Sequence, residues 1–413
     1  MKKYQTFYAV VFLVGLFLFA GYNIYMEADI LYTELTAIEM PQSSQDLKTY
    51  IKAVDDVLTQ NIVGGHMWNE VYGTVYKALG KHEENNFTYV NDKDGFLYAG
   101  NFWNTSNVDA LELALRVKRM QDDVASKGTK VVVIMYPTKY NEEWSDGYYG
   151  VPYNDLNDYA DSVLRFMRRY NVDYIDFRDV FNEANMKMDD IFYKTDHHWT
   201  IPTAFYANTV IIDYLNEQYD AGLDPDGYYR NINNYTSESY ADIYLGSQGR
   251  DAGAVYAGYD DYTYIYPKFE TSYKYEFTYR TKEKGLKEGD ILTTLINRKY
   301  LDYTDPYERE MNNGYLQGIC LIDRIDNVMN QDGPSMMFIR DSYISPVAVF
   351  MSPMCDRISM MWSIHCAPGS IEKAVASEQF DYIFVALAID NLTNEGFPFY
   401  IEEENVVNEG GTD

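Results

Sequence analysis

The chain has 413 residues, a formal net charge of −29 at pH 7 and a sequence pI of about 4.4. A chain this acidic repels nucleic acid and anionic membrane surfaces, so functions that depend on binding either of them are excluded. The three cysteines, Cys320, Cys355 and Cys366, form an odd, sparse set rather than a disulfide framework. We expect three reduced, partly buried thiols, with a single Cys355–Cys366 bridge as the alternative.

The N-terminus carries an apolar segment long enough to cross a membrane. Lys2 and Lys3 precede the uncharged stretch Tyr4–Met26, and about 20 such residues span a bilayer. Because Leu18-Phe19-Ala20 is a poor cleavage site, we expect an uncleaved signal anchor, with a cleaved signal peptide as the alternative. Acidic residues follow the stretch at Glu27, Asp29 and Glu34. This charge pattern predicts a single-pass protein of the cell membrane, with its N-terminus inside and its body on the extracellular face.

The chain divides into four expected parts. Residues 1–26 form the cytoplasmic tip and the anchor. Residues 27–61 form a helical stalk, because Leu31, Leu35 and Ile38 make a helical stripe that Pro41 interrupts. The stalk lifts the domain off the membrane or packs on a partner in the membrane. Residues 62–401 form the extracellular catalytic domain, and the acidic tail, 402–413, is expected to be disordered.

Within the domain, strand-like and helix-like segments alternate. A hairpin is expected over 87–98, helices over 107–127 and 154–170, and strands over 130–136 and 172–177. After these come strands over 336–339, 357–364 and 381–388, and a helix over 370–378. The alternation predicts an α/β domain whose mostly parallel sheet is covered by helices. Residues 222–309, rich in Tyr, Asn and Gly, predict a β-rich insertion that lines a substrate groove or is merely a solvated extension.

A candidate acid–base pair lies in the stretch Asp196-His197-His198-Trp199-Thr200. Thr200 is a plausible N-cap for the helix-like run that follows, with Pro202 in its first turn. Residues two apart on extended backbone project to the same side, so Asp196 can hold one ring nitrogen of His198 and leave the other as a base. The alternatives are a structural histidine or a metal site, although no further ligand motif completes one.

A candidate nucleophile, Ser342, stands at the junction of the strand 336–339 and a following helix. A serine in this position can be exposed for attack, and the N-terminal N–H groups of the helix can bind an oxyanion. The alternative is that Ser342 only caps the helix.

Taken together, the stretch 195–200 and the later Arg340-Asp341-Ser342-Tyr343 resemble the DHHW family, which is grouped with SGNH-hydrolase-like O-acetyltransferases of the AlgX and AlgJ type. The resemblance covers roughly residues 85–390, including Gly95–Gly100, the strand 131–139 and a Gly-Ser loop at 245–250. The order of the motifs, histidine before serine, favours these proteins over secreted esterases. The serine motif departs from the family because Arg340 stands where a glycine is usual.

By this resemblance, Asp196, His198 and Ser342 form a catalytic triad within a three-layer α/β/α sandwich, and His197 has no assigned role. The candidates for the oxyanion site or for substrate binding are Tyr343, Arg340, Arg250, Trp199 and Lys139. No cofactor and no metal are expected.

The resemblance implies an extracellular enzyme that moves an acetyl group through an acyl-serine to hydroxyls of a polysaccharide. Because acetyl-CoA is cytoplasmic, it also implies a membrane-bound acyltransferase that supplies the acetyl group. The acidic composition favours a neutral glycan as the acceptor. The alternatives are a carbohydrate esterase with the same triad, a non-catalytic polysaccharide-binding scaffold and, as the least favoured, a metal phosphoesterase.

Overall fold

A computed structural model describes residues 2–38, 40–41, 46–84, 87–100, 107–141, 156–318 and 320–402. The expected acidic tail therefore lies outside the described residues, except for Glu402. The first two residues of the helix expected over 154–170 also lie outside them.

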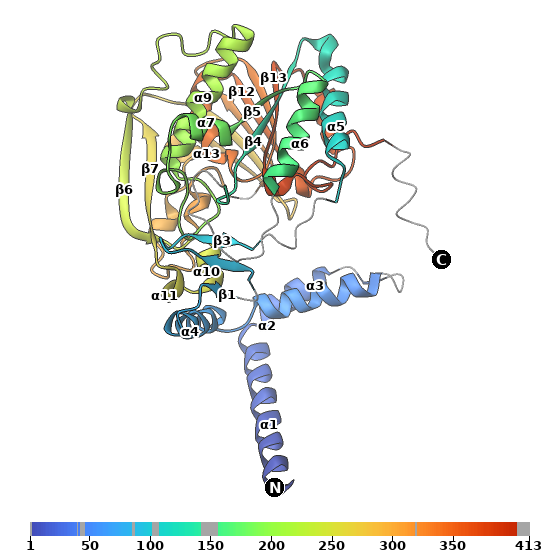
Figure 1. The fold of residues 1–413 in the computed structure, drawn as a ribbon, viewed down its shortest axis with the longest axis vertical. Coiled ribbons are helices and arrows are strands. Elements are labelled where there is room, and N and C mark those ends of the chain that lie inside the picture. The colour runs from blue at the N-terminus through green and yellow to red at the C-terminus, as the bar shows by residue number, and fades with distance from the viewer. Residues whose placement is uncertain are drawn as a thin grey trace.

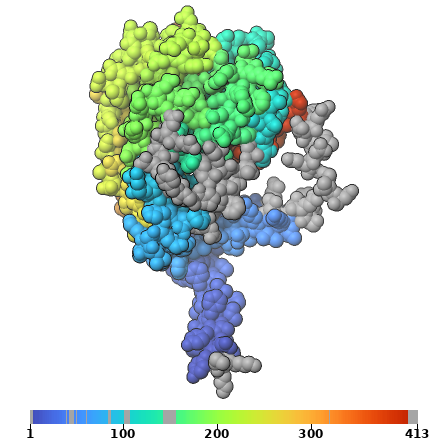
Figure 2. Space-filling view, in the orientation of Figure 1, coloured from blue at the N-terminus to red at the C-terminus, as the bar shows by residue number. Residues whose placement is uncertain are grey.

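The N-terminal helix α1 (Lys2–Met26) projects alone from the rest of the molecule (Figures 1 and 2). Its segment Tyr4–Met26 is long and apolar enough to cross a membrane, and its side chains are exposed except for Asn23 near its end. Two helices follow in the region predicted as a stalk, α2 (Ala28–Ala37) and α3 (Asp46–Gln60). The next helix, α4 (Gly65–Ala78), packs on the underside of the domain (Figure 1).

One eight-stranded sheet organises the domain. Its strands, in spatial order, are β5 (Asp173–Asp176), β4 (Lys130–Tyr136), β13 (Tyr382–Ala388), β11 (Ser335–Arg340), β12 (Arg357–Trp362), β10 (Cys320–Asn327), β8 (Tyr273–Tyr279) and β9 (Lys284–Gly289). The first five strands are parallel, and the last three are antiparallel. The predicted α/β class with a largely parallel sheet is confirmed.

Helices cover both faces of the sheet, which gives three layers (Figure 1). Successive residues of β4 point to opposite faces, so Val131 and Val133 enter one core, and Val132 and Ile134 enter the other. The first core is covered by α5 (Ala110–Val124), α6 (Leu156–Arg169) and α14 (Ser370–Ser377). The second is covered by α7 (Phe177–Glu183), α9 (Ile201–Tyr219) and α13 (Ile344–Met351).

The region 222–309 does not form a solvated extension. Its strands β8 and β9 lengthen the main sheet, because β8 pairs with β10. Its other pair, β6 (Tyr235–Tyr244) and β7 (Asp260–Pro267), packs over the second core. The fully buried tyrosines of the region are Tyr244, Tyr262, Tyr264, Tyr273 and Tyr275. These aromatic rings therefore contribute to the core rather than to an open groove.

Several smaller elements complete the domain. A three-stranded antiparallel sheet consists of β1 (Glu83–Glu84), β2 (Tyr89–Asn91) and β3 (Leu97–Ala99). The short helices are α8 (Met188–Ile191), α10 (Ser247–Ala252), α11 (Ala254–Ala257) and α12 (Ile291–Thr294). All three cysteines are free thiols, with Cys320 and Cys355 buried, so the alternative disulfide is not formed.

Candidate active site

The carboxyl ends of three parallel strands meet at one edge of the sheet, and polar residues follow each of them. Lys139 follows β4, Ser342 follows β11 and Asp390 follows β13. In parallel sheets, this edge is where ligands bind. The segment 195–199 crosses the same edge and is held by an antiparallel bridge between Phe192 and Trp199.

Three of the predicted site residues come together there. His198 Nε2 lies 2.6 Å from Ser342 Oγ, and His198 Nδ1 lies 2.5 Å from Asp196 Oδ1. Ser342 is therefore not a helix cap, because its hydroxyl faces His198 and the N-cap position of α13 is Tyr343. The arrangement is that of a nucleophile, a base and an orienting carboxylate, across 144 residues of sequence.

Asp196 is fully buried, and its oxygens are occupied by donors. Oδ1 accepts from the backbone and ring of His198, and Oδ2 accepts from the Tyr244 hydroxyl at 2.6 Å and from Ser247 N at 2.8 Å. Burial alone would raise the pKa of Asp196, but His198, His197 and these hydrogen bonds hold it well below its usual range. Asp196 is thus a carboxylate at neutral pH.

The hydrogen bonds to Asp196 also argue against the alternative of a metal site. Ligand atoms of Asp196, His197 and His198 lie within 4.8 Å of one another, which is close enough for a shared ion. However, Asp196 accepts four hydrogen bonds, and both ring nitrogens of His198 already face partners. A cation would have to displace these contacts, so the donor set fits a proton relay better than a metal centre.

The predicted Gly-Ser loop, 245–250, packs against Asp196. It directly follows β6 and includes the first four residues of α10, and Gly249 N donates to Thr195 O at 2.8 Å. A Cβ on Gly246 would lie 2.3 Å from Asp196 Cβ and 2.5 Å from Thr195 O. Only glycine allows this close approach, which explains the glycine at this position of the loop.

Two residues predicted for the oxyanion or substrate role are instead structural. Arg340 is only 1 % exposed, and its guanidinium pairs with buried Asp323 at 2.5 Å, so it cannot reach an oxyanion. Trp199 is 2 % exposed, donates from its indole nitrogen to Tyr343 O and packs against the ring of Tyr136. Both side chains therefore stabilise the part of the fold that carries the site.

Of the remaining three candidates, Lys139 and Tyr343 donate to protein partners, whereas Arg250 makes a long ion pair. Lys139 Nζ donates to Leu97 O, Lys194 O and Gln248 Oε1, and burial lowers its pKa to about 7. The backbone N–H of Tyr343 donates to Asp341, and its hydroxyl donates to His197 O. The Arg250 guanidinium lies 3.8 Å from Glu310. Of these, Lys139 and Tyr343 line the small pocket beside His197, whereas Arg250 does not.

Asp390 was not among the predicted site residues, yet it lines that pocket with His197, Tyr343 and Gln248. Its Oδ1 is buried without a hydrogen-bond partner among the described residues. Burial and the nearby Asp341 raise the pKa of Asp390 to about 6. The available signal was positional, because Asp390 follows the buried strand β13 as Ser342 follows β11.

Asp390→Asn is expected to stabilise the fold above about pH 6 and to change little near pH 4. An unfolded aspartate releases its proton near pKa 3.9, about two units lower. The folded state therefore keeps a proton that the unfolded state releases, so the wild type loses stability as pH rises from about 4 to 6. Asparagine cannot ionise, and two units correspond to roughly 3 kcal/mol as an upper bound.

Melting temperatures of the detergent-solubilised full chain at about pH 4.5 and 7.5 check this expectation. A difference between variant and wild type that is the same at both pH values would contradict it. Asp179→Asn, at an exposed aspartate on α7 whose pKa is raised less, is the comparison and is expected to show a smaller difference of the same sign.

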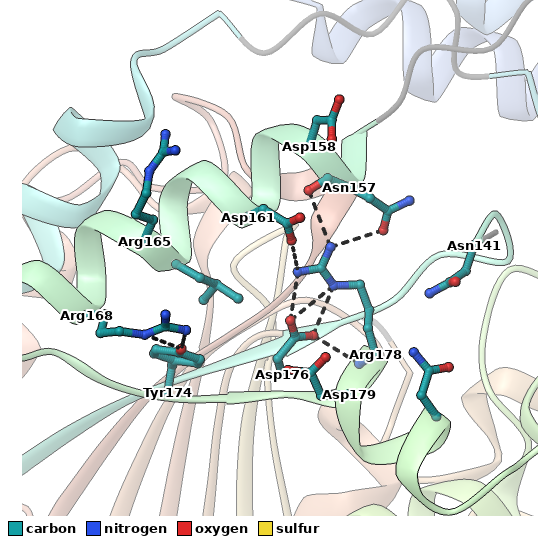
Figure 3. Close-up of a pocket in the computed structure, with 12 residues that line it drawn as sticks. Asn141, Asn157, Asp158, Asp161, Arg165, Arg168, Tyr174, Asp176, Arg178 and Asp179 are labelled. Atoms are coloured by element: carbon teal, nitrogen blue, oxygen red, sulfur yellow. Dashed lines mark hydrogen bonds and ion pairs between the residues drawn. The ribbon is translucent and has the colours of Figure 1, made fainter. Parts of the chain in front are cut away.

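A larger hollow lies elsewhere, at the end of β5 beside α6 (Figure 3). Three of its charged residues pair with one another, since Arg178 Nη2 donates to Asp176 and to Asp161, each at 2.7 Å. Figure 3 shows these carboxylates gathered around the Arg178 guanidinium. Asp196, His198 and Ser342 line neither this hollow nor the small pocket. However, their chain neighbours His197 and Tyr343 line the small pocket, so the candidate active site lies beside that pocket.

A three-layer α/β domain with this constellation at the carboxyl edge of its sheet is an SGNH-hydrolase-like domain. Comparisons agree: residues 91–238 match the family model of the SGNH hydrolase-like domain, acetyltransferase AlgX. That match includes Asp196 and His198 and ends before Ser342. The resemblance predicted from the sequence motifs is thereby confirmed. No curated protein matches the chain.

Solved structures give the same fold at low sequence identity. Bacillus cereus PatB1 with a sulfonyl adduct is 15 % identical, with a TM-score of 0.59, covering 75 % of this chain and 97 % of that one. PatB1 without the adduct is 16 % identical, with a TM-score of 0.59 and coverages of 75 % and 99 %. A DHHW family protein from Eubacterium siraeum is 16 % identical, with a TM-score of 0.54 and coverages of 75 % and 93 %.

Proposed function

We propose that this chain is an O-acetyltransferase that carries an acetyl group on Ser342 and gives it to a hydroxyl of a polysaccharide. The observation that carries the proposal is His198, which bridges Asp196 and the Ser342 hydroxyl at hydrogen-bond distances. The match of residues 91–238 to an acetyltransferase family model supports the reaction class.

The geometry supports a two-step transfer. His198 Nε2 takes the proton of Ser342 Oγ as this oxygen attacks the carbonyl of an acetyl ester, and the leaving alcohol takes that proton from His198. In the second step, His198 deprotonates a sugar hydroxyl, which attacks the acetyl-serine and restores the Ser342 hydroxyl. Asp196 holds the Nδ1 proton and stabilises the charged imidazole. Ser342 also lies beside the N-terminal end of α13, whose partial positive charge favours an oxyanion.

The acceptor that fits this domain is a neutral glycan. The chain has a net charge of −29, and a polyanion is repelled unless local cations compensate. Of the cations considered for that purpose, Lys139 and Arg340 are bound by protein partners, and Arg250 lies 3.8 Å from the carboxylate of Glu310. Lys2 and Lys3 before the span support an extracellular domain on a single anchor. A membrane-bound acyltransferase then supplies the acetyl group, since acetyl-CoA stays inside the cell.

Rapid-quench mass spectrometry of the full chain in detergent tests this function. A soluble activated acetyl ester is expected to acetylate the peptide that contains Ser342. Adding neutral oligosaccharides is expected to speed the loss of that group and to place it on the sugar. In intact cells, protease added outside should remove the activity, because the domain lies on the outer face.

Two outcomes would replace the proposal. If the acetyl group passes only to water and oligosaccharide never speeds its loss, the chain is a carbohydrate esterase with the same triad. If no donor forms an acetyl-enzyme, the non-catalytic scaffold is supported instead.

A further inference from the structure

One face of helix α4 is fixed firmly to the domain. Glu70 accepts hydrogen bonds from the backbone N–H groups of Ala254 and Val255, and Asn69 donates to Arg250 O at 2.9 Å. Gly73 lies so close that a Cβ there would be 2.3 Å from the carbonyl oxygen of Ala252. The helix therefore packs on α10 and α11 without freedom to roll.

The opposite face of α4, with the adjoining Leu79, is apolar and open. Its large side chains are Met67, Trp68, Val71, Tyr72, Val75 and Leu79, each between 41 % and 70 % exposed. Residues 67, 71 and 75, and residues 68, 72 and 79, recur at helical spacing, so they form one continuous stripe. We call this stripe the apolar face of α4. A contiguous apolar patch of this kind on a folded domain marks an interaction surface.

The position of α4 indicates what covers this face. The helix lies at the end of the body where α1 emerges (Figure 1). The rings of Phe19 in α1 and Trp68 in α4 meet edge to face, with centroids 6.1 Å apart. Val63 N, just before α4, donates to Asn23 Oδ1 at 2.7 Å. Trp68 therefore stands level with the last apolar turns of the membrane-spanning segment Tyr4–Met26.

We propose that α4 is an interfacial membrane helix whose apolar face inserts into the outer leaflet beside the membrane-spanning helix α1. Tryptophan and tyrosine favour this depth because their rings are apolar with one polar atom. The occupant is lipid rather than a second copy or another protein, because the contact with α1 puts the face at a height that the bilayer fills. Binding comes from apolar area, so zwitterionic lipid suffices, and the acidic domain disfavours anionic headgroups.

The proposal has a consequence for the candidate site. The apolar face of α4 points away from α10, and α10 supports Asp196 through Ser247 N. Both α10 and β3 lie at the membrane-side end of the body (Figure 1). The pocket is thus held close to the bilayer, at a fixed angle, by two attachments rather than by the single helix α1.

Tryptophan quenching in nanodiscs tests the proposal with the full chain. The discs contain zwitterionic phosphatidylcholine with or without bromine on the acyl chains, which quenches indole fluorescence at contact. Trp68→Phe is expected to remove most of the bromine-dependent loss of fluorescence. Trp362→Phe, the same change on β12, is the matched control and is expected to remove none of it. Circular dichroism of both variants confirms that they fold.

Equal bromine quenching in the wild type and Trp68→Phe would overturn the proposal. A second measurement uses acrylamide, a quencher dissolved in water. Protection of Trp68 from acrylamide together with bromine quenching supports lipid contact. Protection from acrylamide without bromine quenching would mean that another protein or a second copy covers the face, and would also overturn it.

Discussion

Ser342→Ala and His198→Ala are each expected to lower the rate of acyl transfer by about 10⁴-fold or more while the protein stays folded. The first removes the oxygen that carries the acetyl group, and the second removes the base at 2.6 Å from it. Asp196→Asn is expected to leave weak residual activity, because it costs orientation and charge but not the base itself. Single-turnover rates with a soluble acetyl ester measure all three.

The neighbouring residues supply the controls. Ser345→Ala makes the same side-chain change one turn along α13 and is expected to have little effect on the rate. His197→Ala should be milder than His198→Ala, because His197 Nδ1 faces Ser247 Oγ at 3.2 Å rather than Ser342. Full activity in Ser342→Ala would refute the triad, and a larger loss in His197→Ala would mean that the other histidine is the base.

Asp323→Ala is expected to destabilise the fold by about 3–5 kcal/mol. The Asp323 and Arg340 side chains are 0 % and 1 % exposed, so removing the carboxylate leaves a guanidinium buried without its counter-charge. The substitution also takes away the acceptor of the Tyr275 hydroxyl. Urea unfolding of the detergent-solubilised chain gives the free energy of unfolding.

The matched control lies on the same strand. Asp326→Ala removes a carboxylate that pairs with Arg324 where both side chains are about one-third exposed, and such pairs contribute less than about 1 kcal/mol. Because the loss of stability comes from the unpaired charge of Arg340, adding Arg340→Met to Asp323→Ala should recover most of the lost free energy of unfolding. Similar losses of stability for Asp323→Ala and Asp326→Ala would show that the buried pair contributes no more to the free energy of unfolding than the exposed pair.

Local pattern was enough to predict the elements that build the site. The strand expected over 130–136 has those bounds in the structure, and the helix expected over 107–127 is α5 with a short 3₁₀ extension to Lys127. Thr200 caps α9 as predicted, through its hydroxyl and Thr203 N. Apolar periodicity and capping chemistry are encoded by neighbouring residues, so no long-range information was needed.

Long-range pairing explains what could not be predicted. Arg340 was considered for the oxyanion because it adjoins Ser342, and its true partner, Asp323, is brought to it only by the sheet. The tyrosines of 222–309 suggested a groove, yet β8 joins β10 and places its aromatic rings in the core. Asp390 has no local motif. Its place in the pocket follows from the parallel pairing of β11 and β13.

Helix α10 is only six residues long, and both of its ends make hydrogen bonds to other parts of the chain. At its start, Ser247 N holds the carboxylate of Asp196, and near its end the carbonyl oxygen of Arg250 accepts from Asn69 of α4. Because no loop separates the two ends of so short a helix, we expect a tilt at one end to displace the other. The packing of α4 on the domain and the position of the Asp196 carboxylate are therefore expected to be coupled. A change in one carries a free-energy cost in the other, in both directions.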